Sequence, residues 1–478
     1  MLTLKENVPN LSEWEILQKP IVIPKLDEHK ILPEGKKELI ICRDENYNII
    51  SKLKFEDPLL FVIKLKKEES IAGTFIKKYN IRGSSITQTK VVLEGCYTHK
   101  LKGKLLNLGS SGLKVYYPIK GKCAKLTEWY LNGPKNHIYN RSTKRKTVNG
   151  FKRKRILITK EKTEYSKSRN GFNSFSVDFI QIVLNDKQFI LSKVPENFGP
   201  KWSSNIAVEY RKEWGGIPDS NEREKIQELC SFVLGRQLLF IGSTNYDQND
   251  NIIDAYSCNP WGTQSRSLCS DFDYPPIRIT RTSKEGKTAA EIISNLLPSY
   301  LLNRENFLLE EALWYYWVSR QTPPGANFPI LSAAIESVIN GWFKQTKSES
   351  HGNYIEKKLF AALLKNEINE IEKKLESNFY HKEIMRKILD SNKTTLTDGY
   401  RFFFKEITLS IKEEEWKAIA ERHKFVHGRI KFCDADWQEI IRKKQTVETI
   451  FHKIILKMLG YSGRYIDYSV IGWPDNKL

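Results

Sequence analysis

The chain has 478 residues, and 77 lysines and arginines against 57 aspartates and glutamates give it a formal net charge of +20 at pH 7. This length suffices for two or three domains. With 40% hydrophobic and 12% aromatic residues, the chain can form a folded core, which excludes an intrinsically disordered protein. The charge favours a polyanionic partner, and a basic protein without such a partner is the alternative.

The seven cysteines are scattered and never form a CxxC pair. This pattern favours reduced thiols in the cytosol and argues against structural zinc. Met1 is not followed by a basic and then an apolar segment, and no apolar run has the length of a membrane span. We therefore expect a soluble, cytoplasmic protein with no membrane partner and no cofactor.

The N-terminal part, residues 1–290, is expected to be a mostly β domain. Its apolar residues come in short runs separated by turn residues, which is typical of strands in an antiparallel sandwich or barrel. The runs are residues 39–42, 59–63, 91–93, 113–117, 155–158, 175–184, 189–191 and 238–241. Asn185-Asp186 predicts a hairpin turn between two of them, and residues 245–251 are expected to form a polar loop.

The densest positive cluster covers residues 141–146 and 152–155. It is either a loop that contacts nucleic acid or the solvated tip of an extended hairpin. Further along, Asp219 with Glu222 forms a capping box that predicts a helix from there to Gly235.

The C-terminal part, residues 300–478, is expected to be an all-α bundle, so the fold class is α+β with several domains. Helices are predicted from residue 287 to a stop at Pro298, from Asn303 to the prolines at 323–324, and over 328–343. A long charged helix is predicted over 354–389, with its apolar residues inward. Residues 391–399 are expected to form a polar break between two helices. The inward residues are Ile355, Leu359, Leu363, Ile368, Ile371 and Leu375.

The last two predicted helices carry capping boxes, Ser410 with Glu413 and Asp436 with Glu439. The first of them ends with Arg422-His423-Lys424-Phe425-Val426-His427, before the stop signal Gly428.

An arginine offers a fixed cationic fork for a phosphate, and a histidine exchanges a proton near neutral pH. Arg422 and His427 are thus sufficient to cleave RNA without a metal, because the 2′-hydroxyl is the nucleophile. The spacing alone also arises by chance, with His427 at a helix end and Arg422 as a solvated charge. On a regular helix a five-residue step turns about 140°, so the site needs either a loosened helix end or a crevice between two copies.

An all-α bundle with an arginine, a following polar residue and a histidine five positions after the arginine resembles the HEPN ribonuclease superfamily. Residues 334–339, Ala-Ile-Glu-Ser-Val-Ile, are similar to the Ala-Leu-Glu-x-Leu helix of such bundles. The order of a β-rich domain and a HEPN domain resembles the ApeA-like proteins of bacterial defence against phage. Residues 126–134 and 194–203 look like the N-terminal domain of that branch.

The resemblance implies a role for each residue of the motif. Arg422 would bind and polarise the scissile phosphate, and His427 would act as the general base or the general acid. His423 would orient or share the proton. Further candidates are Glu336, as a partner of Arg422, and Lys424 and Arg429, as phosphate contacts, although each of these also fits an ordinary surface residue.

The implied partners are RNA, with tRNA as one candidate, a second copy of the chain in a homodimer or higher even oligomer, and a phage-derived trigger. Two other functions stay open. The bundle could be an inactive HEPN module for dimerisation or nucleic-acid binding, or the β domain could be a sensor with the bundle as its output. A metal-dependent nuclease is disfavoured because no Asp/Glu/His cluster such as HExxH occurs, and His351 and His381 stand alone in polar stretches.

Overall fold

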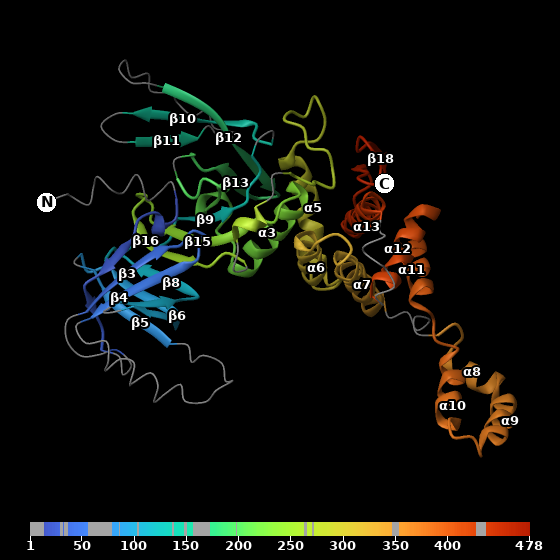
Figure 1. The fold of residues 1–478 in the computed structure, drawn as a ribbon. Helices are drawn as coiled ribbons and strands as arrows, with labels where there is room; N and C mark the ends of the chain where they lie inside the picture. The colour runs from blue at the N-terminus through green and yellow to red at the C-terminus, as the bar shows by residue number, and fades with distance from the viewer. Residues whose placement is uncertain are drawn as a thin grey trace. The chain divides into compact units, whose positions relative to one another are not determined.

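A computed structural model describes most of the chain (Figure 1). The described residues are 14–28, 32, 37–55, 79–85, 87–102, 105–135, 138–147, 151–155, 173–196, 198–261, 265–269, 272–346, 353–426 and 436–478. The chain divides into two compact units, Met1–Pro275 with Ile279–Leu297 and Pro276–Arg278 with Pro298–Leu478. The first unit is an antiparallel β region and the second is mostly helical, as the sequence predicted.

The first unit is built on one hydrogen-bonded sheet of sixteen strands among the described residues. The strands are β1 (Ile21–Ile23), β2 (Lys25–Leu26), β3 (Lys37–Arg43), β4 (Ile49–Phe55), β5 (Tyr79–Ser84), β6 (Lys90–Lys102), β7 (Leu105–Gly109), β8 (Gly112–Tyr116), β9 (Lys125–Leu131), β10 (Arg141–Thr147), β11 (Phe151–Arg155), β12 (Asn173–Leu184), β13 (Lys187–Lys193), β14 (Ile206–Arg211), β15 (Leu239–Tyr246) and β16 (Ile252–Cys258). Their order along the main path is β1-β3-β4-β7-β6-β8-β16-β15-β9-β14-β13-β12-β10-β11, and every pair is antiparallel.

Strand β6 turns the sheet into two layers. Its first half pairs with β5 and β8, and its second half pairs with β7. Gly95, between the halves, has φ +59°, and an added Cβ there would clash with Ser111 Oγ at 2.2 Å. Leu39 and Leu53 from one layer share a buried apolar cluster with Leu93 and Leu113 from the other. A bend at a glycine therefore lets one strand serve two packed layers.

The predicted hairpin at Asn185-Asp186 is confirmed: β12 and β13 pair up to Leu184 and Lys187, and Asn185 has φ 51°. The predicted loop over 245–251 is partly wrong. Strand β15 continues to Tyr246, and β16, which the sequence analysis missed, follows at Ile252. The sequence gives β16 little signal, because its buried residues, Ile252, Ala255 and Ser257, do not alternate regularly and are not all apolar. Residues 59–63 and 156–158 lie outside the described part.

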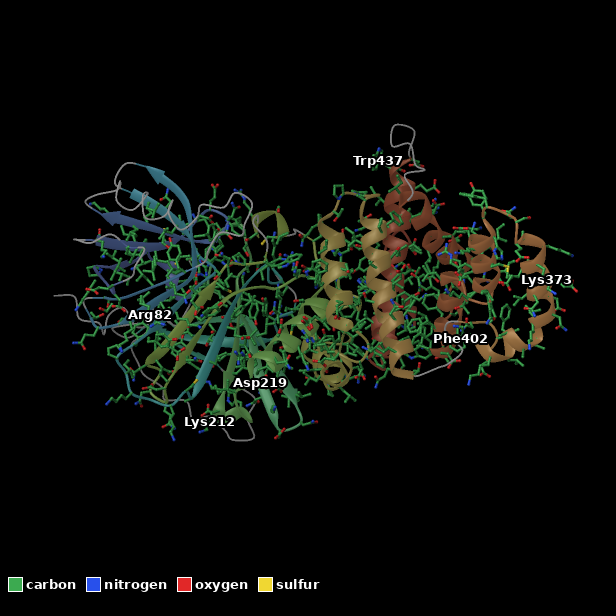
Figure 2. The ribbon with its side chains drawn as sticks, turned by 90° about the horizontal axis from the view of Figure 1, so that it is seen from below. Arg82, Lys212, Asp219, Lys373, Phe402 and Trp437 are labelled. Carbon is green, nitrogen blue, oxygen red and sulfur yellow. The ribbon has the colours of Figure 1, made fainter. Side chains whose placement is uncertain are left out.

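Helix α3 (Ser220–Leu234) packs on this sheet. Its N-cap Asp219, labelled in Figure 2, accepts a hydrogen bond from the backbone N–H of Glu222, and Gly235 ends the helix with φ +66°. The predicted helix is confirmed at both ends. The unit also contains η1 (Ile16–Gln18), η2 (Lys212–Trp214) and α4 (Ser265–Leu268).

The second unit contains the bundle, a short hairpin and most of the helices. They are α5 (Ala289–Asn303, which runs from the first unit into the second), α6 (Leu309–Gln321), α7 (Asn327–Thr346), α8 (Lys357–Leu363), α9 (Lys365–Leu375), α10 (His381–Asp390), α11 (Leu396–Glu406), α12 (Glu413–Val426), α13 (Trp437–Met458), and strands β17 (Arg464–Ile466) and β18 (Asp475–Lys477). Helix α7 contacts α6, α11, α12 and α13, so it lies at the centre of the bundle.

Two predicted helix boundaries in this half are wrong. Helix α5 does not stop at Pro298 but continues to Asn303, because burial of the flanking Leu297 and Tyr300 offsets the missing backbone hydrogen bond. Helix α6 begins at Leu309 rather than Asn303, since Leu308 adopts φ 51° just before it.

The single helix predicted over 354–389 is also wrong. The chain instead forms three short helices, α8 to α10, and a turn in which Asn378 Oδ1 accepts the Tyr380 N–H at 2.8 Å separates the last two. No residue of α8 or α9 is buried, so the predicted inward set has no core to face. The expected break at 391–399 contains the start of α11, which Thr395 caps through the Asp398 N–H.

Among the described helices, none combines the length and the apolar character needed to cross a bilayer.

Candidate active site

Helix α12 carries Arg422 and His423 of the motif, and its first turn is fixed by Glu415. One oxygen of Glu415 accepts the backbone N–H of Lys412 at 2.8 Å. The other accepts Lys453 Nζ of α13 at 2.8 Å, and both side chains are buried. The predicted capping box of Ser410 and Glu413 is therefore wrong, because the helix begins later and Glu415 closes its first turn. Ser410 instead offers its carbonyl to Lys453 Nζ at 3.3 Å.

A second ion pair joins the same two helices nearer the motif. Lys443 Nζ of α13 lies 3.2 Å from Glu421 Oε1 of α12. From the Glu415–Lys453 pair to the Glu421–Lys443 pair, the residue number rises in α12 and falls in α13, so the two helices are antiparallel. This arrangement fixes the end of α12 against the N-terminal half of α13, which Asp436 caps through the N–H groups of Gln438 and Glu439 as predicted.

The last turns of α12 contain Arg422, His423 and Lys424. Arg422 and His423 follow Ile419 by three and four positions, and Ile419 is buried in the bundle. Both residues therefore lie on α12, the helix that contacts α7 and α13 in the bundle. Their side chains and that of Lys424 lie outside the described part, as do His427 and Arg429 entirely. The predicted catalytic set thus remains a prediction.

Glu336, the fourth catalytic candidate, is on α7 and is half-buried. Its Oε1 accepts a hydrogen bond from Tyr400 Oη of α11 at 3.2 Å. Burial raises the pKa of Tyr400 well above its ordinary value, so this hydroxyl keeps its proton and acts as a donor. The structure therefore gives Glu336 a partner that sequence reasoning missed, while the expected partner Arg422 has no described side chain.

A buried polar group inside the bundle was also missed. Tyr316 Oη of α6 lies 2.9 Å from His452 Nε2 of α13, and Arg320 Nη1 donates to the same hydroxyl at 3.3 Å. Burial, with the positive charges of Arg320 and Lys444, lowers the pKa of His452 to about 3. His452 is thus a neutral side chain that holds α13 to α6 rather than a proton carrier near neutral pH.

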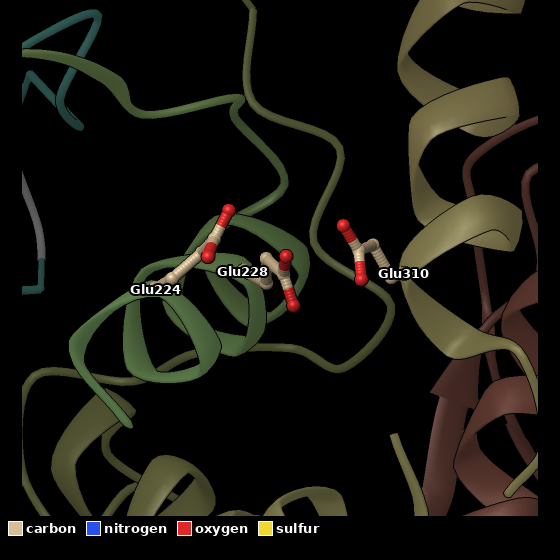
Figure 3. A group of neighbouring side chains, drawn as sticks. All are labelled: Glu224, Glu228 and Glu310. Atoms are coloured by element: carbon tan, nitrogen blue, oxygen red, sulfur yellow. The ribbon is translucent and has the colours of Figure 1, made fainter. Parts of the chain in front are cut away.

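No metal is assigned among the described residues. Figure 3 shows Glu224 and Glu228 one turn apart on α3, and Glu310 on α6. Glu310 belongs to the second unit, where its carboxylate lies 2.8 Å from Arg304 Nη1. Two carboxylates on one helix do not supply the ligand set of a metal site. His381 begins α10, and His351 is outside the described part.

The basic cluster of the first unit forms a two-stranded ribbon, β10 and β11, at the end of the sheet. Its register pairs Lys144 with Lys154, Arg145 with Arg153 and Lys146 with Lys152. Like charges in directly opposed positions destabilise paired strands, so these three pairs lower the stability of the ribbon. The backbone agrees with the hairpin alternative of the sequence analysis, and the side chains of the ribbon are outside the described part.

The two segments that resemble the ApeA-like N-terminal domain meet in the first unit. The Asn132 N–H donates to Ser203 Oγ at 2.9 Å, and the Gly133 N–H donates to the Ser204 carbonyl at 2.7 Å. An added Cβ at Gly133 would lie 2.3 Å from Ile206 Cγ2, so this approach requires a glycine. These contacts give Asn132 and Gly133 a role in the fold, and they assign no chemistry to the two segments.

Comparisons with protein-family models, with curated proteins and with solved structures found no match to this chain.

Proposed function

We propose that the protein is a metal-independent endoribonuclease of the HEPN type that acts in anti-phage defence, with the β-rich unit sensing or restraining the helical one. The observation that carries this proposal is the position of the motif. Arg422 and His423 lie in the last turns of α12, next to Glu421, which pairs with Lys443 of α13. A pair of cleavage residues needs such a rigid support, because catalysis depends on precise placement.

The chemistry follows from the residue types. Arg422 holds the scissile phosphate and stabilises the charge that builds up on its oxygens during the reaction. His427 removes the proton of the 2′-hydroxyl, which attacks the adjacent phosphate, or it protonates the departing 5′-oxygen. His427 of a second protomer takes the complementary role in a dimer, while His423 orients or shares the proton. The products are a 2′,3′-cyclic phosphate and a 5′-hydroxyl.

The charge of the chain supports RNA as the substrate. A net charge of +20 attracts the phosphate backbone, and the β10–β11 ribbon concentrates lysines and arginines on two paired strands. Because those opposed cations destabilise the ribbon, a polyanion that neutralises them is a reason for the chain to keep them. Lys424 and Arg429 would add phosphate contacts beside the cleavage site.

The test is RNA integrity and survival in cells that produce the wild-type chain, Arg422→Ala or His427→Ala, with and without phage. General acid–base catalysis contributes about 10²–10⁴ in rate, so the loss of His427 should abolish the effect. Lys417→Ala, on the exposed face of α12, is the matched control. If both motif variants protect cells and cleave RNA as the wild type does, the motif is not catalytic, and the inactive bundle becomes the better account.

A further inference from the structure

The second unit contains a pocket of about 290 Å³ beside the start of α11. Phe343 from the end of α7 and Phe402 from α11 form part of its wall, with ring centroids 6.3 Å apart. Tyr354 and Asp398 also line the pocket, and Phe402 is labelled in Figure 2. This volume suits a small chemical group rather than a large ligand.

The rings of this pocket are held in place from behind. Trp342 lies 6.3 Å from Phe402 and 5.5 Å from Phe403, centroid to centroid, and Phe403 is buried. Tyr354 donates its hydroxyl proton to Asp398 Oδ2 at 2.5 Å, and its backbone N–H donates to the Asn392 carbonyl at 2.8 Å. The aromatic wall is therefore fixed before any ligand arrives.

The charge inside the pocket is negative. Hydrogen bonds from Thr395 and Tyr354 lower the pKa of Asp398, so its carboxylate is ionised at neutral pH. Asn353 and Thr394 add neutral polar groups, and no lysine or arginine is among the lining residues. Arg401 lies 3.9 Å from Asp398 Oδ1, but its side chain is 68% exposed and faces the Trp416 ring at 5.7 Å.

Capping alone does not explain this composition. Thr395 and Asp398 form the capping box of α11, which accounts for the carboxylate. It does not account for Phe402 and Tyr354, which remain 37% and 56% exposed around that carboxylate. Exposed aromatic rings beside an ionised carboxylate create a surface that attracts cations through both the ring faces and the charge.

We propose that this pocket binds an organic cation, an alkylammonium or guanidinium group. A phosphate would be repelled by Asp398, and a metal ion would find one carboxylate where it needs several oxygen ligands. The group can belong to a free small molecule or to a lysine or arginine side chain of a peptide, since the chemistry is the same. The pocket lies where the α8–α10 segment joins the bundle, so an occupant would also tie Tyr354 to α11.

The experiment is a titration of the full-length protein, by calorimetry, with choline and with its neutral isostere 3,3-dimethylbutan-1-ol. A second arm uses a short peptide with one trimethyllysine or arginine, and a third uses adenosine. Choline should bind at least about tenfold more tightly than the neutral isostere, because only the cation gains from the ring faces and the carboxylate. Tighter binding of the peptide than of choline would identify a protein segment as the source of the cation.

Three variants locate the site. Asp398→Asn keeps the capping geometry and removes the charge, and Phe402→Leu removes one ring at a half-exposed position, so each should weaken choline binding about tenfold. Glu406→Gln, exposed on the same helix, removes the same charge outside the pocket and should leave binding unchanged. Equal binding of choline and the neutral isostere, wild-type affinity in Asp398→Asn, or no cation binding at millimolar concentration would overturn the proposal. Binding of adenosine alone would reassign the pocket to a planar base.

Discussion

The buried ion pair between Glu415 and Lys453 should control the stability of the helical unit. The side chains are 7% and 5% exposed, and the two charged atoms are 2.8 Å apart. Glu415→Gln leaves the lysine charge inside the bundle with only neutral acceptors, the new amide oxygen and the Ser410 carbonyl. Breaking such a pair lowers the free energy of unfolding by about 3–5 kcal/mol, and we expect the lower end because the amide still accepts a hydrogen bond.

Glu413 of helix α12 offers a matched, exposed control. Glu413 is in the same first turn, and it forms an ion pair with Lys417 at 2.8 Å, but the side chains are 82% and 70% exposed. Glu413→Gln should therefore produce no measurable change. The assay is urea unfolding followed by circular dichroism at 222 nm, which reports mainly on the helical unit.

A double variant separates the ion pair from a simple loss of packing. Glu415→Gln with Lys453→Met removes both charges and keeps an acceptor for the Lys412 N–H, so it should recover most of the stability that Glu415→Gln alone loses. The reasoning is wrong if Glu415→Gln unfolds at the same urea concentration as Glu413→Gln, or if the double variant is less stable than Glu415→Gln.

Three further predictions concern other described contacts. As pH falls from 6.5 toward 3, the unfolded chain binds a proton at His452 and the folded chain does not, so the free energy of unfolding should fall by up to about 1.4 kcal/mol per pH unit. His452→Gln should flatten this slope, which urea unfolding between pH 7 and 5 measures. Asn392→Ala removes two hydrogen bonds to Ile355, at 2.8 and 3.0 Å, and should speed hydrogen exchange in α8–α10 while the rest of the bundle stays protected. Glu15→Gln breaks a bidentate pair with the buried Arg43 guanidinium, at 2.8 and 2.9 Å, and should lower the free energy of unfolding of the first unit by about 3 kcal/mol or more in urea.

Each of these predictions has a result that would contradict it, and two of them have a matched control variant. An unchanged pH slope in His452→Gln would place the proton uptake elsewhere. Exchange that rises evenly over the whole bundle in Asn392→Ala would mean global rather than local loss, and Asn378→Ala, at an exposed turn, is its control. For the first unit the control is Glu94→Gln, which breaks a half-exposed pair with Lys114, and an equal effect of both glutamine variants would refute the prediction.

The parts of the fold that the sequence predicted are those with a local signal. Asp219 and Asp436 cap their helices as expected, and Asn185-Asp186 makes its turn, because each depends on a few neighbouring residues. Ser410 failed as a cap because Glu415 has a partner in α13, Lys453, that is distant in the sequence. The helix end predicted at Pro298 was wrong for a similar reason, because the burial of Leu297 and Tyr300 lets α5 continue past the proline.

The 354–389 segment shows what periodicity cannot predict. Its apolar residues repeat at helical spacing, but the spacing does not say whether a partner surface exists, and α8 and α9 bury nothing. For the candidate site, the sequence placed Arg422 and His423 on a helix, and the structure confirms that helix as α12. The partner of Glu336, Tyr400, was not predictable, because no helix was predicted over α11, whose start lies in the expected break at 391–399.

The measurement that tests the central claim most directly is the chemistry of the RNA ends. RNA is taken from phage-challenged cells that produce the wild-type chain or His427→Ala, and its 3′ ends are mapped by mass spectrometry. Attack by the 2′-hydroxyl predicts new 2′,3′-cyclic phosphates in the wild type, absent from the variant, and an added oligonucleotide with 2′-deoxyribose at the cleaved position should resist cleavage by the purified protein. New ends that carry a 3′-hydroxyl, or cyclic phosphates that persist in His427→Ala, would contradict the ribonuclease mechanism.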